Sequence, residues 1–362
     1  MKRLFRRRFL ESAATALAFA LLTVAGSVAT ASAAGANAYT VTDLVSDVPG
    51  MASHVDSDLV NAWGLTSLPT SPWWVADNGT NVSTLYLADG TKRSLTVQVP
   101  NAPTGAVSNT GSNFVVSNGT SSGPALFIFA TEEGKILGWN PTVSPTDAQV
   151  AVDQSGIDAV FKGLAIASTA GGDFLYATDF HHGRVDVFDG SFNPVTTPSA
   201  FVDPHIPSGY APFGIQNVGG MIVVTYAKQD AAAHDDVAGQ GHGFVDMFDT
   251  SGKLLVRVAR HGQLNSPWGL AMAPAGFGSF GGDLLVGNFG DGQISAFKPQ
   301  ADGTFELVGQ LRTDDRKVLT IDGLWSLQFG KGAANNGSTD TLFFTAGPEG
   351  EAHGLFGTIT AG

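Results

Sequence analysis

A hydrophobic run, a polar turn and an alternating segment recur in this order along the chain. In residues 174–190, FLYATDFHHGRVDVFDG, the apolar Val185 and Val187 flank the polar Asp186. This period of two is typical of a half-buried β-strand, and the glycine-containing turn before it indicates a hairpin. The module occurs six times, in residues 73–90, 125–140, 174–190, 221–252, 284–298 and 342–359. The chain is therefore expected to be a repeat protein built from β-hairpins.

A second, shorter pattern precedes each hairpin module and consists of a large residue, a glycine and an aliphatic residue. Its copies begin at Trp63-Gly64, Thr104-Gly105, Lys162-Gly163, Phe213-Gly214 and Trp268-Gly269, with the variant GLWSL at residues 323–327. Successive copies lie 41 to 58 residues apart, which is enough chain for about four short strands. Six such units predict an all-β, six-bladed β-propeller with four-stranded blades. A β-helix has a much shorter period, and two β-sandwiches would not repeat one phrase.

The last unit contains only three strand patterns, and a fourth strand must come from elsewhere to close the ring. Residues 39–47, YTVTDLVSD, alternate like a strand and precede the first unit. We expect this segment to supply the outer strand of the last blade. Residues 39–362 are thus predicted to form a single six-bladed propeller.

The first 38 residues have the pattern of an export signal. A cationic start, MKRLFRRRFL, is followed by an alanine-rich apolar stretch and then by small residues, with cleavage expected after Ala33 or Ala38. Arg6 and Arg7, followed by Phe9 and Leu10, fit the twin-arginine pattern, although a general secretory signal with additional arginines is the alternative. We expect a periplasmic or secreted protein that crosses the membrane by the twin-arginine route.

Composition narrows the classes of partner. Cleavage of the signal removes five Lys and Arg residues and one Glu, which changes the formal net charge from −13 to −17. So acidic an exported chain is not expected to bind nucleic acid or anionic lipid. No stretch after the signal is apolar for long enough to span a membrane, and no cysteine is present for a disulfide or a thiolate site. We expect a monomer whose partner is a small molecule, a glycan or a protein.

Several segments carry a resemblance to known propellers. The hairpin module resembles NHL-type and gluconolactonase-like repeats, and LVNAWGL, SPWGLAMAPAGFG, GDLLVGNFGDG and FTAGPEGEAHGLFG resemble a family of exported bacterial propeller proteins. This resemblance covers nearly all of the chain after the signal and implies the fold and the export. It transfers no catalytic residue.

Polar and aromatic residues gather where propellers usually bind, on the face where loops lead into the inner strands and where the second and third strands of each blade connect. The candidate ligand-binding residues are Asn61, Asn78, Asp179, Tyr210, Asp230, Asn265, Trp268, Asn288 and Trp325. Trp63, Trp268 and Trp325 would either stack on a ring-shaped ligand or fill space between blades. The insertion at residues 227–241 could bind a cation or form a lid over this face, and the alternative is a solvated acidic loop.

Three of these residues occupy equivalent positions in different units. Aligning the hairpin turns places Asp179 opposite Asn288, and Asn78 takes the same position in the first unit. They are candidate ligands for Ca²⁺ or another divalent cation. The alternative is that they cap their own turns through bonds to the backbone. The histidine of TDFHHG at position 182 recurs as His242 and His353, and strand spacing indicates that these are turn residues too far apart to share a metal.

Three functions remain open from the sequence. The first is a binding or interaction module with a ligand funnel on one face. The second is a divalent-metal-dependent enzyme with its metal in the central funnel, either a hydrolase of lactones or esters or a lyase. The gluconolactonase-like resemblance implies one divalent metal held by acidic and Asn or Asp groups. This chain lacks the acidic motif expected in the first unit and has LVNAWG there. The third is a structural protein of the cell envelope or matrix.

Overall fold

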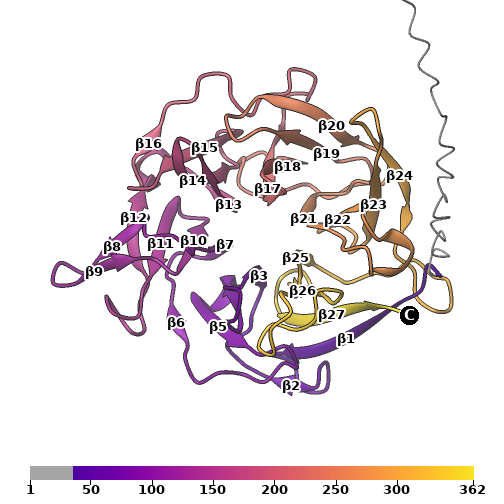
Figure 1. Ribbon diagram of the computed structural model, residues 1–362, viewed down its shortest axis with the longest axis horizontal. Helices are drawn as coiled ribbons and strands as arrows, with labels where there is room; N and C mark the ends of the chain where they lie inside the picture. Colours follow the sequence, from indigo (N-terminus) through magenta and orange to yellow (C-terminus); the bar gives the residue numbers. More distant parts are fainter. Residues whose placement is uncertain (1–35) are drawn as a thin grey trace, which may run out of the picture. The chain divides into compact units, whose positions relative to one another are not determined.

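Six sheets, antiparallel except for one short parallel strand pair, surround a common axis in the computed structural model, which describes residues 36–362 (Figure 1). The predicted signal therefore lies almost entirely outside the described residues. Blade one contains β3 (Ala62–Thr66), β4 (Trp73–Asp77), β5 (Val82–Tyr86) and β6 (Val97–Gln98). Blade two contains β7 (Pro103–Ser108), β10 (Phe127–Thr131), β11 (Lys135–Trp139) and β12 (Gln149–Asp153). Blade three contains β13 (Phe161–Thr169), β14 (Gly172–Asp179), β15 (Arg184–Asp189) and β16 (Pro194–Val195).

The second half of the ring repeats this arrangement. Blade four contains β17 (Tyr210–Val218), β18 (Met221–Lys228), β19 (Gly243–Phe248) and β20 (Leu254–Arg260). Blade five contains β21 (Pro267–Met272), β22 (Leu284–Asn288), β23 (Ile294–Pro299) and β24 (Phe305–Gln310). Blade six contains β25 (Leu324–Phe329), β26 (Leu342–Ala346), β27 (Leu355–Ala361), β1 (Tyr39–Ser46) and the short β2 (His54–Val55). The predicted six-bladed, all-β architecture is confirmed.

The remaining elements of the described residues are small. A hairpin of β8 (Val115–Ser117) and β9 (Ser122–Pro124) lies outside the six blades. Three single-turn 3₁₀ segments occur: η1 (Asn78–Thr80), η2 (Ser155–Ile157) and η3 (Gly278–Phe280). No helix among residues 36–362 has the length and apolar character required to cross a membrane.

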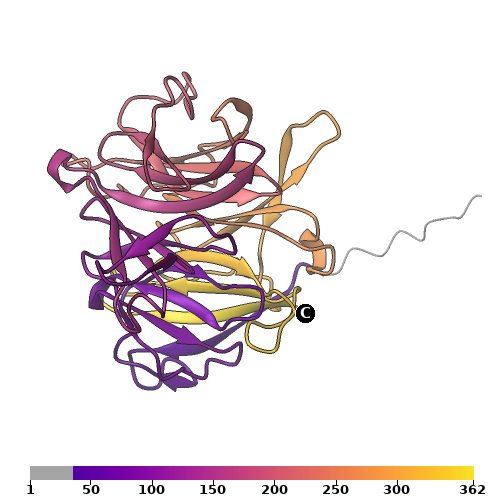
Figure 2. The ribbon, with the colours of Figure 1, turned by 60° about the vertical axis from the view of Figure 1, so that its left-hand side comes forward.

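The last blade is closed by the N-terminal strand, as the sequence predicts. β1 pairs antiparallel with β27 from Tyr39 opposite Ala361 to Ser46 opposite Leu355, so the indigo and yellow strands lie side by side (Figures 1 and 2). The buried ring of Tyr39 packs 4.9 Å from that of Phe277 in blade five, measured between centroids. β2 adds a fifth strand that the sequence pattern did not indicate, because it spans only two exposed residues.

The recurring glycine phrase has a steric cause. Each inner strand contacts the inner strand of the next blade around the axis, and the glycine lies at that contact. A Cβ on Gly64 would lie 2.2 Å from the Thr104 carbonyl oxygen, and one on Gly214 would lie 2.1 Å from that of Trp268. Side chains cannot be accommodated at such distances, so glycine permits the inner strands to close around the axis.

Candidate ligand site at the Lys162 face

Aromatic side chains occupy the axis of the propeller. Trp63, Phe213 and Trp268 each precede the glycine of their phrase, and together with Trp325 of the variant phrase they form one buried cluster. The Trp63 and Trp325 rings stack with centroids 3.8 Å apart, and Phe289 stacks on the other side of Trp325 at 3.9 Å. Trp268 and Trp325 therefore pack inside this cluster, which is the space-filling alternative for these tryptophans.

Lys162 occupies an aromatic position of the repeat and is buried with the cluster. Its ammonium lies 5.1 Å from the centroid of the Trp63 ring and pairs with Glu132 and, at 3.2 Å, with Asp235. Burial of the ammonium opposes its charge, but the two carboxylates outweigh burial and raise the pKa of Lys162. A buried lysine held charged at the axis is a site candidate, since burying charge is costly unless it is paired.

Two asparagines continue this polar network around the axis. Asn61 donates to the Asn78 amide oxygen at 3.2 Å and to Glu351 at 2.7 Å, and it accepts a bond from the Trp325 indole at 2.9 Å. Asn78 donates in turn to Glu132 at 2.9 Å. Burial raises the pKa of Glu351 against the effect of its bond from Asn61. Side chains of blades one, two and six are thus tied to the same network as Lys162.

The insertion of blade four extends to the axis and completes this network. The turn is fixed by Asp230, whose carboxylate accepts the backbone N–H of His234 at 2.9 Å. The His234 ring bonds to Asp235 at 2.9 Å, and Asp235 pairs with Lys162 of blade three. Glu132, His234 and Asp235 each offer one ligand atom, and these atoms lie within 4.8 Å of one another. We call the surface formed by this network the Lys162 face.

An open cavity of about 420 Å³ adjoins the network between blades two, three and four. Its carboxylates come from Glu132, Glu133 and Asp158, and its rings come from His181 and His234. Glu133 and Asp158 form no ion pair with any lysine or arginine of residues 36–362. The cavity therefore carries negative charge that the described chain does not neutralise.

Some of the ligand-binding residues predicted from the sequence belong to the network of the Lys162 face, and others lie elsewhere in the propeller. Asn61, Asn78 and Trp325 belong to it directly, and Asp230 supports it through the insertion. Tyr210 begins β17 and packs edge-on against Phe244. Asn265 instead accepts the Gly239 N–H at 2.7 Å and donates to Asp291 at 3.3 Å, so it holds the far end of the insertion.

Asn78, Asp179 and Asn288 take part in separate hydrogen-bond groups. The buried Asp179 bonds the His182 ring at 2.7 Å and accepts the Val160 N–H at 3.3 Å. Asn288 donates to the Gln263 carbonyl at 2.7 Å and to Asp291 at 3.1 Å. No hydrogen bond or shared partner links the three within the described chain. Asp179 accepts the His182 N–H of its own turn at 3.2 Å, as expected of a turn cap, whereas the Asn288 side chain bonds to another loop and to the Asp291 side chain. The histidines at 182, 242 and 353 likewise bond to separate partners.

Glu132, Lys162 and Glu351 were not among the predicted site residues. For Lys162 the sequence does contain a signal, because lysine replaces the aromatic residue of the repeated phrase. Glu132 and Glu351 lie in hairpin turns, where acidic residues are ordinary, and only the packing of the blades around the axis brings them into the network of Lys162.

Comparison with known proteins supports the fold and places the chain among uncharacterised relatives. No known protein-family profile matches the chain. The solved structure of a streptogramin B lyase is similar over 90% of this chain and 98% of its own, with a TM-score of 0.51 and 11% identity. A glucose dehydrogenase is similar over 89% of this chain and all of its own, with a TM-score of 0.53 and 12% identity. A gluconolactonase is similar over 65% of this chain at a TM-score of 0.41, which carries no functional argument.

Two relatives are similar in sequence as well. Both are uncharacterised proteins of Acanthamoeba polyphaga mimivirus. One is 33% identical over 329 residues, which cover 87% of this chain and 78% of the relative, and the other is 32% identical over 337 residues, which cover 89% and 85%. These relatives are viral, so they do not support the bacterial origin that the resemblance implies. The chain belongs to the same family of six-bladed propeller proteins as these two mimivirus proteins.

Proposed function

We propose that the protein is a binding module whose ligand is a small amine-bearing molecule that occupies the cavity at the Lys162 face. The observation that supports this is the pair of carboxylates from Glu133 and Asp158 in one cavity, which form no ion pair with a lysine or arginine among the described residues, beside Glu132, which Lys162 already pairs. An ammonium group would neutralise this charge through hydrogen bonds to the carboxylates.

The neighbouring Lys162 illustrates the same chemistry within the chain. Its ammonium is held by two carboxylates over the face of an indole, an arrangement that also suits the ammonium group of a ligand. Glu132 is largely buried, so its interaction with a cation is screened less by water than that of an exposed carboxylate. Glu133 and Asp158 are exposed and add a weaker attraction each.

Isothermal titration with putrescine tests this proposal, with 1,4-butanediol as the neutral counterpart of the same length. We expect putrescine to bind and butanediol not to bind. The double variant Glu133→Gln/Asp158→Asn is expected to weaken putrescine binding about 10-fold, which corresponds to about 1.4 kcal/mol. Glu306→Gln, an exposed carboxylate of blade five, serves as the control and should leave binding unchanged. Equal binding of the diol, or an unchanged double variant, would contradict the proposal.

A divalent-metal hydrolase is the second candidate, because Glu132, His234 and Asp235 could together hold a cation. The Lys162 ammonium already bonds to two of these three residues, so a metal must compete with it. Lys162→Met should then raise the affinity for Ca²⁺ or Mn²⁺, measured by titration and by thermal unfolding. A variant that binds no metal and a native protein that hydrolyses no lactone would rule this candidate out. Absence of both ligand and metal binding would favour the third candidate, a structural role in the cell envelope or matrix.

We also propose that the protein is exported, on the basis of residues 1–38 alone. In a bacterial host, Arg6→Lys/Arg7→Lys should retain the unprocessed chain in the cytoplasm if the twin-arginine route is used. Unchanged appearance of the processed chain outside the cytoplasm would exclude that route.

A further inference from the structure

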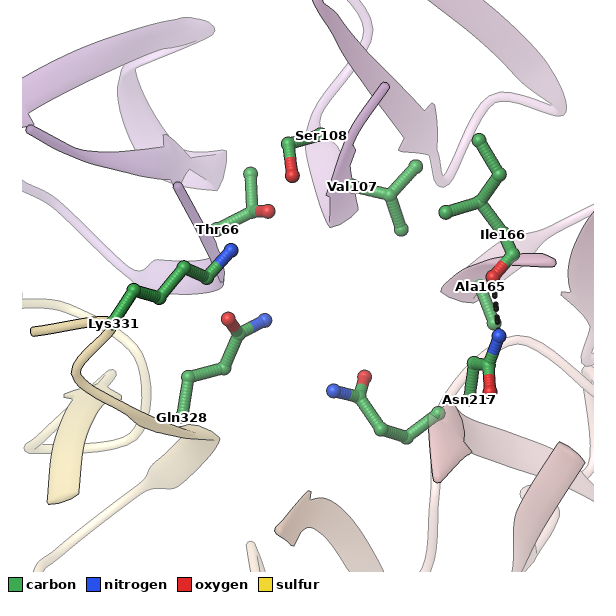
Figure 3. A pocket seen from close by; sticks show the side chains of 9 residues that line it. Thr66, Val107, Ser108, Ala165, Ile166, Asn217, Gln328 and Lys331 are labelled. Atoms are coloured by element: carbon green, nitrogen blue, oxygen red, sulfur yellow. Dashed lines mark hydrogen bonds between the residues drawn. The ribbon is translucent and has the colours of Figure 1, made fainter. Parts of the chain in front are cut away.

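The opposite mouth of the propeller contains a second cavity with different chemistry. Each inner strand runs from the Lys162 face to this mouth, so the residue three positions after the axis residue faces the second opening. Five of these residues, together with their neighbours, line a cavity of about 350 Å³ (Figure 3). They are Thr66, Val107, Ala165, Gln216 and Gln328.

This cavity is separated from the Lys162 face. Apolar side chains of the inner strands, including Leu65, Leu164 and Leu327, and the ring of Trp268 line the space between, which has a volume of only about 20 Å³. A space of that size holds about one water molecule and no organic ligand. The two mouths are therefore independent sites.

One cation, Lys331, points into the second cavity and has no acidic partner. Its ammonium bonds to the Ser67 carbonyl, and it forms no ion pair with any carboxylate in residues 36–362. The chain has 32 acidic residues, but none of them is among the residues that line this cavity. The side chain is exposed at the mouth, yet protein atoms around the ammonium desolvate it and lower the pKa of Lys331.

The backbone that carries Lys331 is held rigidly. Asn336 is fully buried and accepts the backbone N–H groups of Lys331 and Ala333 at 3.3 and 3.2 Å. The Asn336 amide donates to three carbonyls in the 68–71 loop of blade one, at 3.0 to 3.3 Å. The loop of blade six is thus fastened to blade one before any ligand arrives, which limits the entropy that binding would lose.

Neutral polar groups complete the cavity and retain unused hydrogen-bonding capacity. Neither the Gln216 amide nor the Thr66 hydroxyl has a side-chain hydrogen bond in the described residues. Gln328 donates to the Leu65 carbonyl at 2.6 Å and keeps its amide oxygen free. In Figure 3 the side chains of Lys331 and Gln328 converge on the same space as Thr66. Val107 and Ile166 supply an apolar wall.

We propose that this second cavity binds a small hydroxylated molecule that carries an oxyanion, either a carboxylate or a phosphate. Lys331 would pair with the oxyanion, the Thr66 hydroxyl and the Gln216 amide would donate to it, and the Gln328 oxygen would accept from a ligand hydroxyl. The volume lies within the range of cavities that hold one small ligand. The ligand class is opposite in charge to that proposed for the Lys162 face, and neither site depends on the other.

Titration with three matched sugars tests the proposal: glucuronate, glucose 6-phosphate and neutral glucose. We expect at least one of the two anions to bind at least 10-fold more tightly than glucose, and the tighter of the two identifies the anionic group. Lys331→Met should weaken anion binding at least 10-fold while putrescine binding at the Lys162 face stays unchanged. The exposed Lys253→Met in blade four is the matched control and should bind both anions as the native protein does.

A second variant protects this test against misfolding. Gln216→Ala removes an amide that has no partner within the described chain, so it should leave the melting temperature unchanged and weaken anion binding about 3-fold or more, as expected for one lost hydrogen bond. If the three sugars bind equally, if none of them binds, or if Lys331→Met binds the anions as tightly as the native protein, the proposal is wrong.

Discussion

Replacing Lys162 tests whether the buried charge network exists for stability or for binding. In Lys162→Met the side chain keeps its apolar volume and loses its charge, so Glu132 is left beside Asn78 without its cation. Breaking a buried ion pair from one side costs about 3–5 kcal/mol. The Glu132 side chain is 16% exposed and keeps its bond from Asn78, so we expect the lower end of that range, about 3 kcal/mol.

The double variant Lys162→Met/Glu132→Gln removes both charges. Uncharged replacements of buried pairs are often neutral or stabilising, and we expect this variant to lie within about 1 kcal/mol of the native protein. The single changes and the double change therefore yield a coupling free energy of about 2 kcal/mol or more. If the double variant is as stable as the native protein but binds ligand differently, the Lys162–Glu132 pair serves ligand binding and not stability.

Urea unfolding followed by tryptophan fluorescence provides the measurement, because Trp63 lies beside the lysine. With a slope of about 3 kcal/mol per molar urea, the single variant should unfold at a urea concentration about 1 M lower. Lys253→Met on the surface is the control and should shift the midpoint very little. Additive effects, with the double variant as unstable as the sum of the two single variants, would refute this reasoning.

Three further predictions concern the ring itself, and urea midpoints measure each. Tyr39→Ala should lower the free energy of unfolding by about 3–5 kcal/mol, because a buried aromatic side chain of the closing strand is lost. Thr42→Ala, on the exposed side of the same strand, should lower it by less than about 0.5 kcal/mol. Equal effects of the two changes would argue against closure of the ring by this strand. Gly214→Ala should cost about 3 kcal/mol because its Cβ would meet the next inner strand, while Gly156→Ala, which has open space, should be nearly neutral. Burial raises the pKa of Asp246 from 3.8 to about 7, so between these two pH values the native state holds a proton that the unfolded state has lost. The free energy of unfolding should therefore fall as the pH rises from 4 to 7, by about 4 kcal/mol at most. Asp246→Asn should reduce this decline, and an unchanged pH profile would contradict the assignment.

The fold could be predicted from the sequence because its determinants are local and repeated. Gly64 and Gly214 are visible as a phrase, and the contact that requires them recurs at successive blades of the ring. The closing strand was also visible, since the last unit lacked one strand and residues 39–47 supplied the pattern. The short β2 was not, because two exposed residues carry no periodicity.

The candidate site could be predicted only in part, for a geometric reason. Equivalent positions in the hairpin turns, such as Asp179 and Asn288, have no hydrogen-bond partner in common, unlike equivalent positions of the inner strands, which meet at the axis. Side chains of different blades meet at the axis, and loops of unequal length bring further residues there. Glu132 reaches Lys162 from a hairpin turn, and Asp235 reaches it from the insertion of blade four. One of the two exceptions to the repeat, Lys162 in place of an aromatic residue, is an informative signal in the sequence; the other is Thr104.

The pairing of β1 with β27 also has a consequence for biosynthesis. Tyr39 lies opposite Ala361, so the ring joins residues that are separated by 322 positions in the chain. Individual blades can form hairpins while the ribosome is still translating, but the closing pair cannot form until the last strand has emerged. Contacts of such sequence separation are slow to form. Until the last strand has emerged, β1 lacks its partner strand, so its edge stays unpaired while the rest of the ring is synthesised.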